Sequence, residues 1–525
     1  MAGLSVIFTL IVICSGGWGL DDISFGIKSG HYEESLSALE QIYEANRQKE
    51  KLTYEIARVE ELYKKGLEET QKAELLHGDE KERTLKSALD YLVAAHAGFK
   101  LAAYDVRNRL DVPYRKFVMF RVGDSLRSQL PVLKALKREE LYESTLLGKN
   151  GVITSYREAI EAYPDSMEAE FAAFWVGTTL YMRGDVRKAA EYYRMVKDHG
   201  GSSLKLADDS RYMLGRCLWD MGDVEEAQAT FESFLEDFPE SALTPSVAIA
   251  AGDSYAFDPK SLPKRMKAYK IALKSIEEKK YELYKLEAMT SMLRLGEIYL
   301  ELGSPDEAVK YLKPCVSRNR ANGYAPLMLE SMIKLSQSYI EIGDVPHLRE
   351  AVQILREASK LAEDDISRRI DIASLLGQAY YELGQYGNAV KAYRIAWNCK
   401  RLDYENGYRL ADSYFEIGDY DRALEVSRNF IERIADIGRV SPEIRRSLLK
   451  LYLLVGDIMF RKGEYEKAVE AYRQGAQGNF KLYALEQMAE CYVRTGQSSE
   501  ADKIKKIIKD LGGRGDIQAS SLSSQ

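Results

Sequence analysis

The sequence predicts an all-α protein built as a solenoid of stacked helical pairs. One frame of residues recurs after residue 170, and its clearest copy is Gly377-x-x-Tyr380 followed by Gly384, Ala389 and Tyr393. In the clearest copies, the small residue of the second half lies twelve positions after the first small residue, and a bulky residue follows four positions later. A period of roughly 34 to 45 residues is typical of stacked units that contact only their neighbours.

Each half of the frame predicts an amphipathic helix. Apolar residues in both halves recur at the 3.6-residue period of a helix that is buried on one side. A glycine separates the halves, because glycine tolerates the left-handed conformation that a helix C-terminus needs. Gly377 and Ala389 are small because the two helices approach closely at these positions. The glycines expected at the turns are Gly184, Gly222, Gly303, Gly343, Gly384, Gly418, Gly463 and Gly496.

This frame resembles the tetratricopeptide repeat, which has Leu-Gly-x-x-Tyr in its first helix, Ala and then Tyr or Phe in its second, and Pro at its end. The resemblance covers about two-thirds of the chain. It implies a right-handed α-solenoid of about nine tetratricopeptide-like helix pairs, and a role in binding other proteins. The small residues of the nine first helices are Gly177, Gly215, Gly252, Gly296, Ser336, Gly377, Ala411, Gly456 and Ala489.

We expect four parts along the chain. These are a signal peptide or N-terminal anchor (1–19), an N-terminal helical region with a coiled-coil-like segment (20–145), the solenoid (146–510) and a disordered tail (511–525). Apolar residues between Ala38 and Tyr63 fall at alternating seven-residue positions, and a second helical stretch runs from Leu85 to Leu110. Together they predict a long helical hairpin, with a short coiled coil as the alternative. The segment around Tyr156 resembles the second helix of a repeat, but no repeat can be placed between Pro113 and Pro131.

The N-terminus predicts export. The run from Leu4 to Cys14 is mostly apolar, is followed by small residues and then by the first acidic residues, and is too short to span a bilayer as an ordinary helix. This pattern is typical of a secretory signal peptide, although no Lys or Arg precedes it. We therefore expect a mature N-terminus between Ser15 and Asp22. A retained anchor that associates with the membrane is the alternative, and the bulky Ile13 disfavours a lipid on Cys14.

Composition and motifs argue against catalysis and against nucleic-acid binding. The net charge is −7 and no basic stripe that could neutralise phosphates is present, so a nucleic-acid partner is not expected. The five histidines are scattered, the cysteines lack metal or disulfide spacing, and the HExxH, GxSxG and P-loop patterns are absent. The sequence therefore predicts no catalytic residue, no cofactor and no metal ion, and the protein is not expected to be an enzyme.

The predicted partner-binding surface lies on the first helices of the repeats. In the resembled family, first helices line a groove, and the residue after the small residue points into it together with its i+4 neighbour. Family members that clamp a terminal carboxylate have Asn and Lys there, whereas these positions are mostly acidic here, which favours a basic partner. The alternative is an ordinary solvated helix end. The predicted residues are Glu297, Glu301, Glu341, Tyr381, Glu382, Asp412, Phe415, Glu416 and Phe460.

Two repeats also suggest a compartment. Phe238-Pro239-x-Ser241 and Tyr163-Pro164-x-Ser166 end their helices in a way that resembles bacterial cell-envelope tetratricopeptide proteins, such as the outer-membrane assembly lipoprotein and the Tol–Pal-associated periplasmic coordinator. We therefore expect an exported, periplasmic or cell-envelope scaffold that binds protein partners. The alternative is an accessory subunit of an envelope enzyme, of an export complex or of a polysaccharide-secretion complex.

Overall fold

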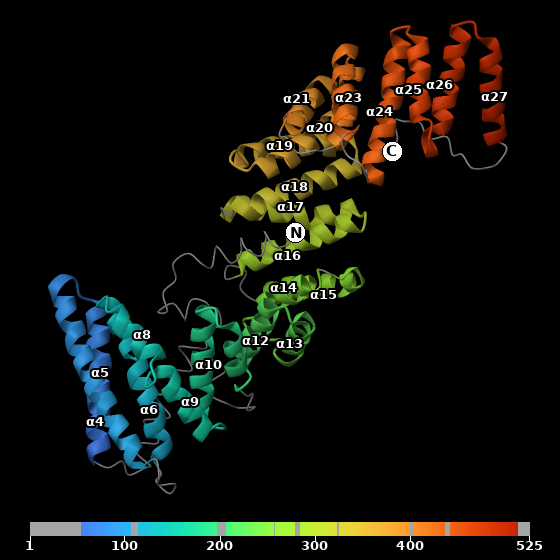
Figure 1. Cartoon of the computed structure of the whole chain (residues 1–525). Coiled ribbons are helices and arrows are strands. Elements are labelled where there is room, and N and C mark those ends of the chain that lie inside the picture. Colours follow the sequence, from blue (N-terminus) through green and yellow to red (C-terminus); the bar gives the residue numbers. More distant parts are fainter. Residues whose placement is uncertain are drawn as a thin grey trace. The chain divides into compact units, whose positions relative to one another are not determined.

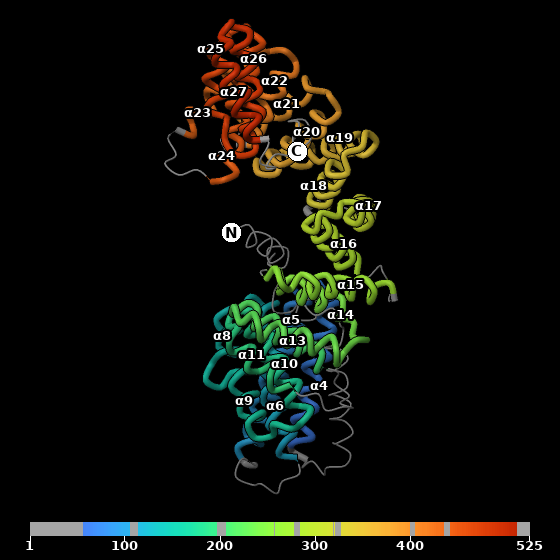
Figure 2. Tube along the Cα trace, turned by 90° about the vertical axis from the view of Figure 1, so that its right-hand side faces the viewer, coloured from blue at the N-terminus to red at the C-terminus, as the bar shows by residue number. Residues whose placement is uncertain are grey.

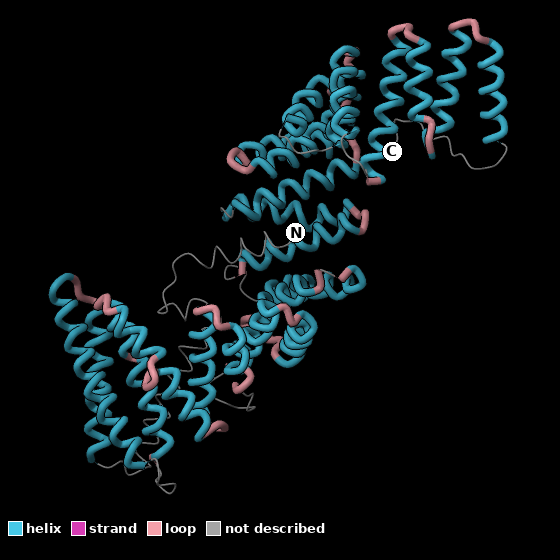
Figure 3. Tube along the Cα trace, viewed as in Figure 1, coloured by secondary structure: helices cyan, strands magenta, loops and turns pink. Residues whose placement is uncertain are grey.

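The computed structural model describes residues 54–106, 114–196, 206–256, 258–278, 284–322, 325–398, 404–435 and 441–512. These residues form helices, turns and loops, and no β-strand occurs among them (Figure 3). The chain divides into two compact units, Met1–Ala288 and Met289–Gln525. The expected signal peptide and all but the first two residues of the expected tail lie outside the described residues.

The described part of the first unit begins with two long helices that pack side by side (Figure 1). They are α4 (Tyr54–Glu74) and α5 (Gly78–Val106). Gly66 of α4 lies against Leu92 of α5, whereas the earlier Val59 lies against the later Gly98. The two helices therefore run antiparallel, as in the predicted helical hairpin, and the apolar stripe of α4 packs within its own chain.

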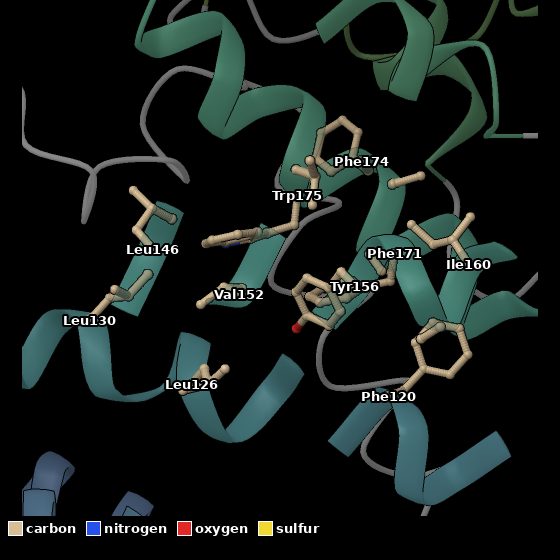
Figure 4. Packing of buried hydrophobic residues seen from close by; sticks show 14 of the residues in the cluster. Phe120, Leu126, Leu130, Leu146, Val152, Tyr156, Ile160, Phe171, Phe174 and Trp175 are labelled. Atoms are coloured by element: carbon tan, nitrogen blue, oxygen red, sulfur yellow. The ribbon is translucent and has the colours of Figure 1, made fainter. Parts of the chain in front are cut away.

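Four helices follow the hairpin, and the last of them is the segment around Tyr156 that resembles the second helix of a repeat. They are α6 (Arg115–Arg127), α7 (Gln129–Ala135), α8 (Glu139–Leu147) and α9 (Val152–Ala162). Gly123 of α6 lies against the ring of Tyr156 of α9, and the Tyr156 hydroxyl donates a hydrogen bond of 2.6 Å to Asp124. Figure 4 shows the Tyr156 ring in a buried cluster that also contains Trp175 of the next helix. A small residue against a bulky one is the packing of the regular repeats, so α6 and α9 form a further pair with α7 and α8 inserted between them.

The described residues contain nine regular helical pairs, at the nine positions that the sequence predicts. The three in the first unit are α10 (Met167–Met182) with α11 (Val186–Tyr193), α12 (Ala207–Met221) with α13 (Val224–Asp237), and α14 (Thr244–Ser254) with α15 (Leu262–Glu278). A short 3₁₀ helix, η2 (Pro259–Ser261), precedes α15 at the predicted interruption of the third repeat.

The other six pairs belong mainly to the second unit, and α16 starts just before its boundary. They are α16 (Lys285–Glu301) with α17 (Pro305–Asn322), α18 (Ala325–Ile342) with α19 (Val345–Leu361), α20 (Ile366–Glu382) with α21 (Tyr386–Asn398), α22 (Tyr404–Glu416) with α23 (Tyr420–Ala435), α24 (Pro442–Arg461) with α25 (Tyr465–Gly475), and α26 (Lys481–Arg494) with α27 (Ser498–Gly512). A 3₁₀ turn, η4 (Gly478–Phe480), joins α25 to α26. Figures 1 and 2 show α24 to α27 side by side, and each contacts the next. Because α27 continues to Gly512, the last helix includes the first two residues of the expected tail.

The turn glycines have the conformation that the sequence predicts. All eight have positive φ, between 64° at Gly303 and 85° at Gly222. At a representative turn, the N–H of Gly384 donates to the carbonyl of Tyr381 (2.9 Å) and the N–H of Gln385 to that of Tyr380 (2.8 Å). These bonds satisfy carbonyls that the end of a helix would otherwise leave without a donor.

Close helix approach explains the small residues of the frame. A Cβ atom on Gly377 would lie 2.5 Å from a ring carbon of Tyr393, and one on Gly456 would lie equally close to Tyr472. Ala389 is fully buried between the helices of its pair. The solenoid is therefore held by small-to-bulky contacts within pairs and by apolar contacts between successive pairs. None of the described helices combines the length and the apolar character needed to cross a membrane.

Candidate partner-binding surface

Four predicted glutamates occupy equivalent positions on successive first helices of the second unit. Glu301, Glu341, Glu382 and Glu416 stand at or next to the ends of α16, α18, α20 and α22, each two residues before a turn glycine. All four side chains are exposed. Equivalent positions of stacked repeats face the same side. We call these four residues the carboxylate row.

Two members of the row are held by a glutamine one turn earlier. Gln337 donates from Nε2 to Glu341 at 3.0 Å, and Gln378 does the same to Glu382 at 3.1 Å. The amides bind one carboxylate oxygen in each case and add no charge, so both glutamates remain acidic groups at the surface.

Glu297 does not extend the row. Its carboxylate lies 2.9 Å from the guanidinium of Arg294 on the same helix, and only 15% of its side chain is exposed. This pair cancels the charge of Glu297 locally. Its position one turn before Glu301 therefore adds no net negative charge to the surface.

Asp412 is half-buried and does not face solvent freely, contrary to the sequence-based expectation. The hydroxyl of Tyr381 donates to its Oδ2 at 2.8 Å, and the guanidinium of Arg409 lies 5.7 Å from the centre of the Tyr381 ring. Burial raises the pKa of Asp412 to about 6, although the Tyr381 hydrogen bond opposes the change. Tyr381 and Asp412 thus join two successive first helices, α20 and α22.

Asp457, at the equivalent position of the next pair, in α24, is likewise half-buried and was not among the predicted site residues. A single oxygen, Oδ1, accepts hydrogen bonds from Tyr472 (2.6 Å) and from Tyr483 (2.9 Å). Burial raises the pKa of Asp457 to about 6. The sequence feature that could have identified Asp457 is its position directly after the small residue Gly456, which matches the position of Asp412 after Ala411.

The predicted aromatic contacts are partly used inside the protein. All three rings are half-buried and pack against the first residue of the following helix, which closes the turn between the two helices of a pair. The ring pairs and the distances between their centres are Tyr381 with Tyr386 (5.1 Å), Phe415 with Tyr420 (5.6 Å) and Phe460 with Tyr465 (5.4 Å). Only the outer part of each ring remains for a partner.

One tyrosine hydroxyl in this region differs from its equivalents. In other pairs the corresponding hydroxyl donates to the residue after the small residue, as Tyr193 does to Thr178 (3.0 Å) and Tyr472 to Asp457. Tyr393 is 2% exposed, and its hydroxyl has no hydrogen-bond partner among the described residues. The equivalent acceptor position holds Gln378, whose amide is directed to Glu382.

This surface combines exposed negative charge with exposed apolar side chains. The carboxylate row supplies exposed negative charge, and the turn residues Leu302 and Ile417, 49% and 46% exposed, directly follow two of its glutamates. Within the described ranges, no group of three or more His, Cys, Asp or Glu residues is arranged to hold a metal ion.

Family models with the description "Tetratricopeptide repeat" match five segments of the chain. One model matches residues 209–241 and 405–433, and a second matches residues 290–322, 370–396 and 449–477. Each matched segment contains a helical pair or most of one.

Several solved structures resemble parts of the chain at low sequence identity. A tetratricopeptide repeat protein from Parabacteroides merdae is 18% identical, covers 54% of this chain and 98% of its own, and has a TM-score of 0.35. The apo form of RapI is 16% identical over 66% of this chain and 99% of its own, with a TM-score of 0.42. The TPR-like repeats of a putative kinesin light chain from Podosopora anserina are 22% identical over 36% of this chain and 92% of their own, with a TM-score of 0.31.

Proposed function

We propose that this tetratricopeptide repeat protein is a non-enzymatic scaffold that binds a basic segment of a partner protein along the carboxylate row. Tetratricopeptide repeats are interaction modules, because stacked pairs present an extended surface. The observation that carries the proposal is the recurrence of an exposed glutamate at one position of four successive pairs.

Electrostatics favours a cationic occupant. Like charges along the row repel one another, and the lysine or arginine side chains of a partner relieve that repulsion. Exposed ion pairs contribute only about 0.2 to 1 kcal/mol each, so several must act together. Leu302 and Ile417 supply apolar contact beside the charges, which favours a partner segment that carries both basic and apolar side chains.

The binding test uses a fluorescent hexalysine peptide and a variant in which all four glutamates of the row become glutamine. A matched control replaces four glutamates of the second helices α23 and α25, namely Glu425, Glu432, Glu466 and Glu470, with glutamine. Both variants gain the same net charge, and all eight side chains are exposed. Anisotropy titrations between roughly 50 and 300 mM salt cover the range in which such charges become screened.

The row variant is expected to bind hexalysine at least roughly tenfold more weakly and with a shallower salt dependence, while the control resembles the wild type. Equal weakening by both variants would show that only net charge matters. Unchanged binding by the row variant would show that the row is an ordinary solvated helix end.

The proposed location of this scaffold is the cell envelope, after export. The support is the apolar run from Leu4 to Cys14 with small residues after it. Fractionation followed by N-terminal sequencing tests the proposal, and the expected result is an exported chain that begins between Ser15 and Asp22. Recovery of the chain with Met1 intact from the cytosol would refute export and leave the binding proposal standing.

A further inference from the structure

A shallow hollow of about 550 Å³ lies on α19, the second helix of the fifth regular pair. Its lining residues are one stripe of that helix: Arg349, Val352, Gln353, Arg356, Glu357 and Lys360. Helix spacings of three and four residues bring side chains to one face, so the three cations point to the same side. This face belongs to a second helix, whereas the carboxylate row belongs to first helices.

The positive charge of the hollow is not cancelled locally. Arg349, Arg356 and Lys360 are exposed, and none of them forms a salt bridge with a residue in the described part of the chain. The one carboxylate of the hollow, Glu357, accepts two hydrogen bonds from Arg320 of α17, one from Nε at 3.2 Å and one from Nη2 at 2.5 Å. The hollow therefore carries three positive charges in a chain whose net charge is −7.

One of the cations is held in place. The Nε of Arg356 donates to the Tyr380 hydroxyl at 2.8 Å, and its guanidinium lies 5.7 Å from the centre of that ring. The terminal nitrogens of Arg356 are not used in this bond. A guanidinium that is already positioned loses less rotamer freedom when it binds an anion, and its planar fork matches a carboxylate.

We infer that the α19 hollow binds an acidic segment of a protein partner. The three cations are separated by seven and four residues along the helix, or roughly 10 and 6 Å at 1.5 Å per residue. In an extended peptide, side chains two residues apart lie on the same face about 6 to 7 Å apart, which is close to the spacing of Arg356 and Lys360. Val352 is half-buried and offers carbon contact at the floor of the hollow. Three cations are few for nucleic acid, since proteins that bind it commonly contact about 6 to 10 phosphates.

The inference is independent of the carboxylate row and gives the protein two surfaces of opposite charge. Its test uses a fluorescent hexaglutamate peptide, with inorganic tripolyphosphate and a single-stranded oligothymidylate as competing probes. The full chain carries the substitutions Arg349→Gln, Arg356→Gln and Lys360→Gln. A second variant, Arg349→Gln with Lys360→Gln, leaves the Arg356–Tyr380 bond intact, so a folding defect caused by its loss is recognised.

The matched control removes three other exposed cations of the second unit, in Arg422→Gln, Lys467→Gln and Arg473→Gln. The triple variant of the hollow is expected to bind hexaglutamate at least roughly tenfold more weakly, the double variant to lie between it and the wild type, and the control to resemble the wild type. Binding of hexalysine should not weaken in any of them.

Three results would overturn the inference. The first is wild-type chain that does not bind hexaglutamate. The second is an equal loss of binding in the control and in the triple variant of the hollow. The third is displacement of hexaglutamate by tripolyphosphate or oligothymidylate at equal or lower charge concentration, which would assign the hollow to phosphates.

Discussion

Replacing Asp457 with asparagine is expected to stabilise the C-terminal repeats at neutral pH. Burial raises the pKa of this carboxyl from its ordinary value of 3.8 to about 6 in the folded protein. Asparagine resembles the protonated acid and has no charge to bury. Its oxygen can still accept the hydrogen bonds of Tyr472 and Tyr483, because both are directed at the same oxygen of Asp457.

The size and the pH range of the effect follow from the two pKa values. Well below pH 3.8 the carboxyl is protonated in both the folded and the unfolded protein, and it contributes nothing to the pH dependence. As the pH rises from about 4 to 6, the unfolded chain loses its proton first, so the free energy of unfolding falls. One pH unit corresponds to about 1.4 kcal/mol, so the penalty above pH 6 is up to about 3 kcal/mol.

The measurement is thiol labelling of Cys491, which is fully buried in α26 and reacts only after local opening. Mass spectrometry identifies the labelled peptide, and variant and wild type are compared at the same pH so that the reactivity of the thiol cancels. At pH 7 the Asp457→Asn chain should be labelled roughly 10- to 100-fold more slowly, and at pH 4 the difference should shrink to about threefold or less.

The control is Asp421→Asn, since that carboxylate is exposed and its hydrogen bond with Lys462 lowers its pKa. This substitution should not slow labelling at any pH. Equal labelling of the Asp457→Asn variant and the wild type at pH 7 would refute the reasoning. So would a difference of the same size at pH 4, because it would not arise from ionisation.

Four further substitutions test the packing and the buried polar contacts. Gly377→Leu forces the helices of its pair apart and should destabilise by at least roughly 1 to 3 kcal/mol, measured by urea unfolding; wild-type stability would mean that the repeat frame is misplaced. Tyr393→Phe removes a buried hydroxyl that has no hydrogen-bond partner among the described residues, so the free energy of unfolding should be unchanged or higher. Tyr472→Phe removes a hydroxyl that donates to Asp457 and should lower the free energy of unfolding by about 0.5 to 1.5 kcal/mol. A larger loss of stability for Tyr393→Phe than for Tyr472→Phe would contradict the hydrogen-bond assignment. Arg121→Ala breaks the buried ion pair with Glu60, whose atoms lie 2.8 Å apart, and should destabilise the N-terminal helices by about 3 to 5 kcal/mol. The expected readout is faster hydrogen exchange in α4 to α6, and unchanged exchange would refute this role.

Most of the regular fold could be predicted from the sequence because its signals are local. The residues that identify a repeat are a turn glycine, a small residue and a bulky residue four positions later, and all of them contact residues of the same helical pair. Because Gly377 and Tyr393 are separated by a fixed number of residues, folding of the pair brings them into contact. The pair of Gly123 and Tyr156 uses the same packing, and although the segment around Tyr156 resembled a second repeat helix, its partner around Gly123 was not recognised. Two inserted helices, α7 and α8, separate its members, so the spacing that identifies the other pairs is lost.

The solvent exposure of each candidate site residue depended on the tertiary structure. Glu382 and Asp412 are both acidic residues on first helices, and the sequence gives no reason to separate them. Glu382 is exposed, whereas Asp412 is half-buried under the hydroxyl of Tyr381 from the preceding pair. The physical reason is that helical periodicity determines which side of its own helix a residue occupies. How far a side chain from the neighbouring pair covers it is decided by the way the pairs stack.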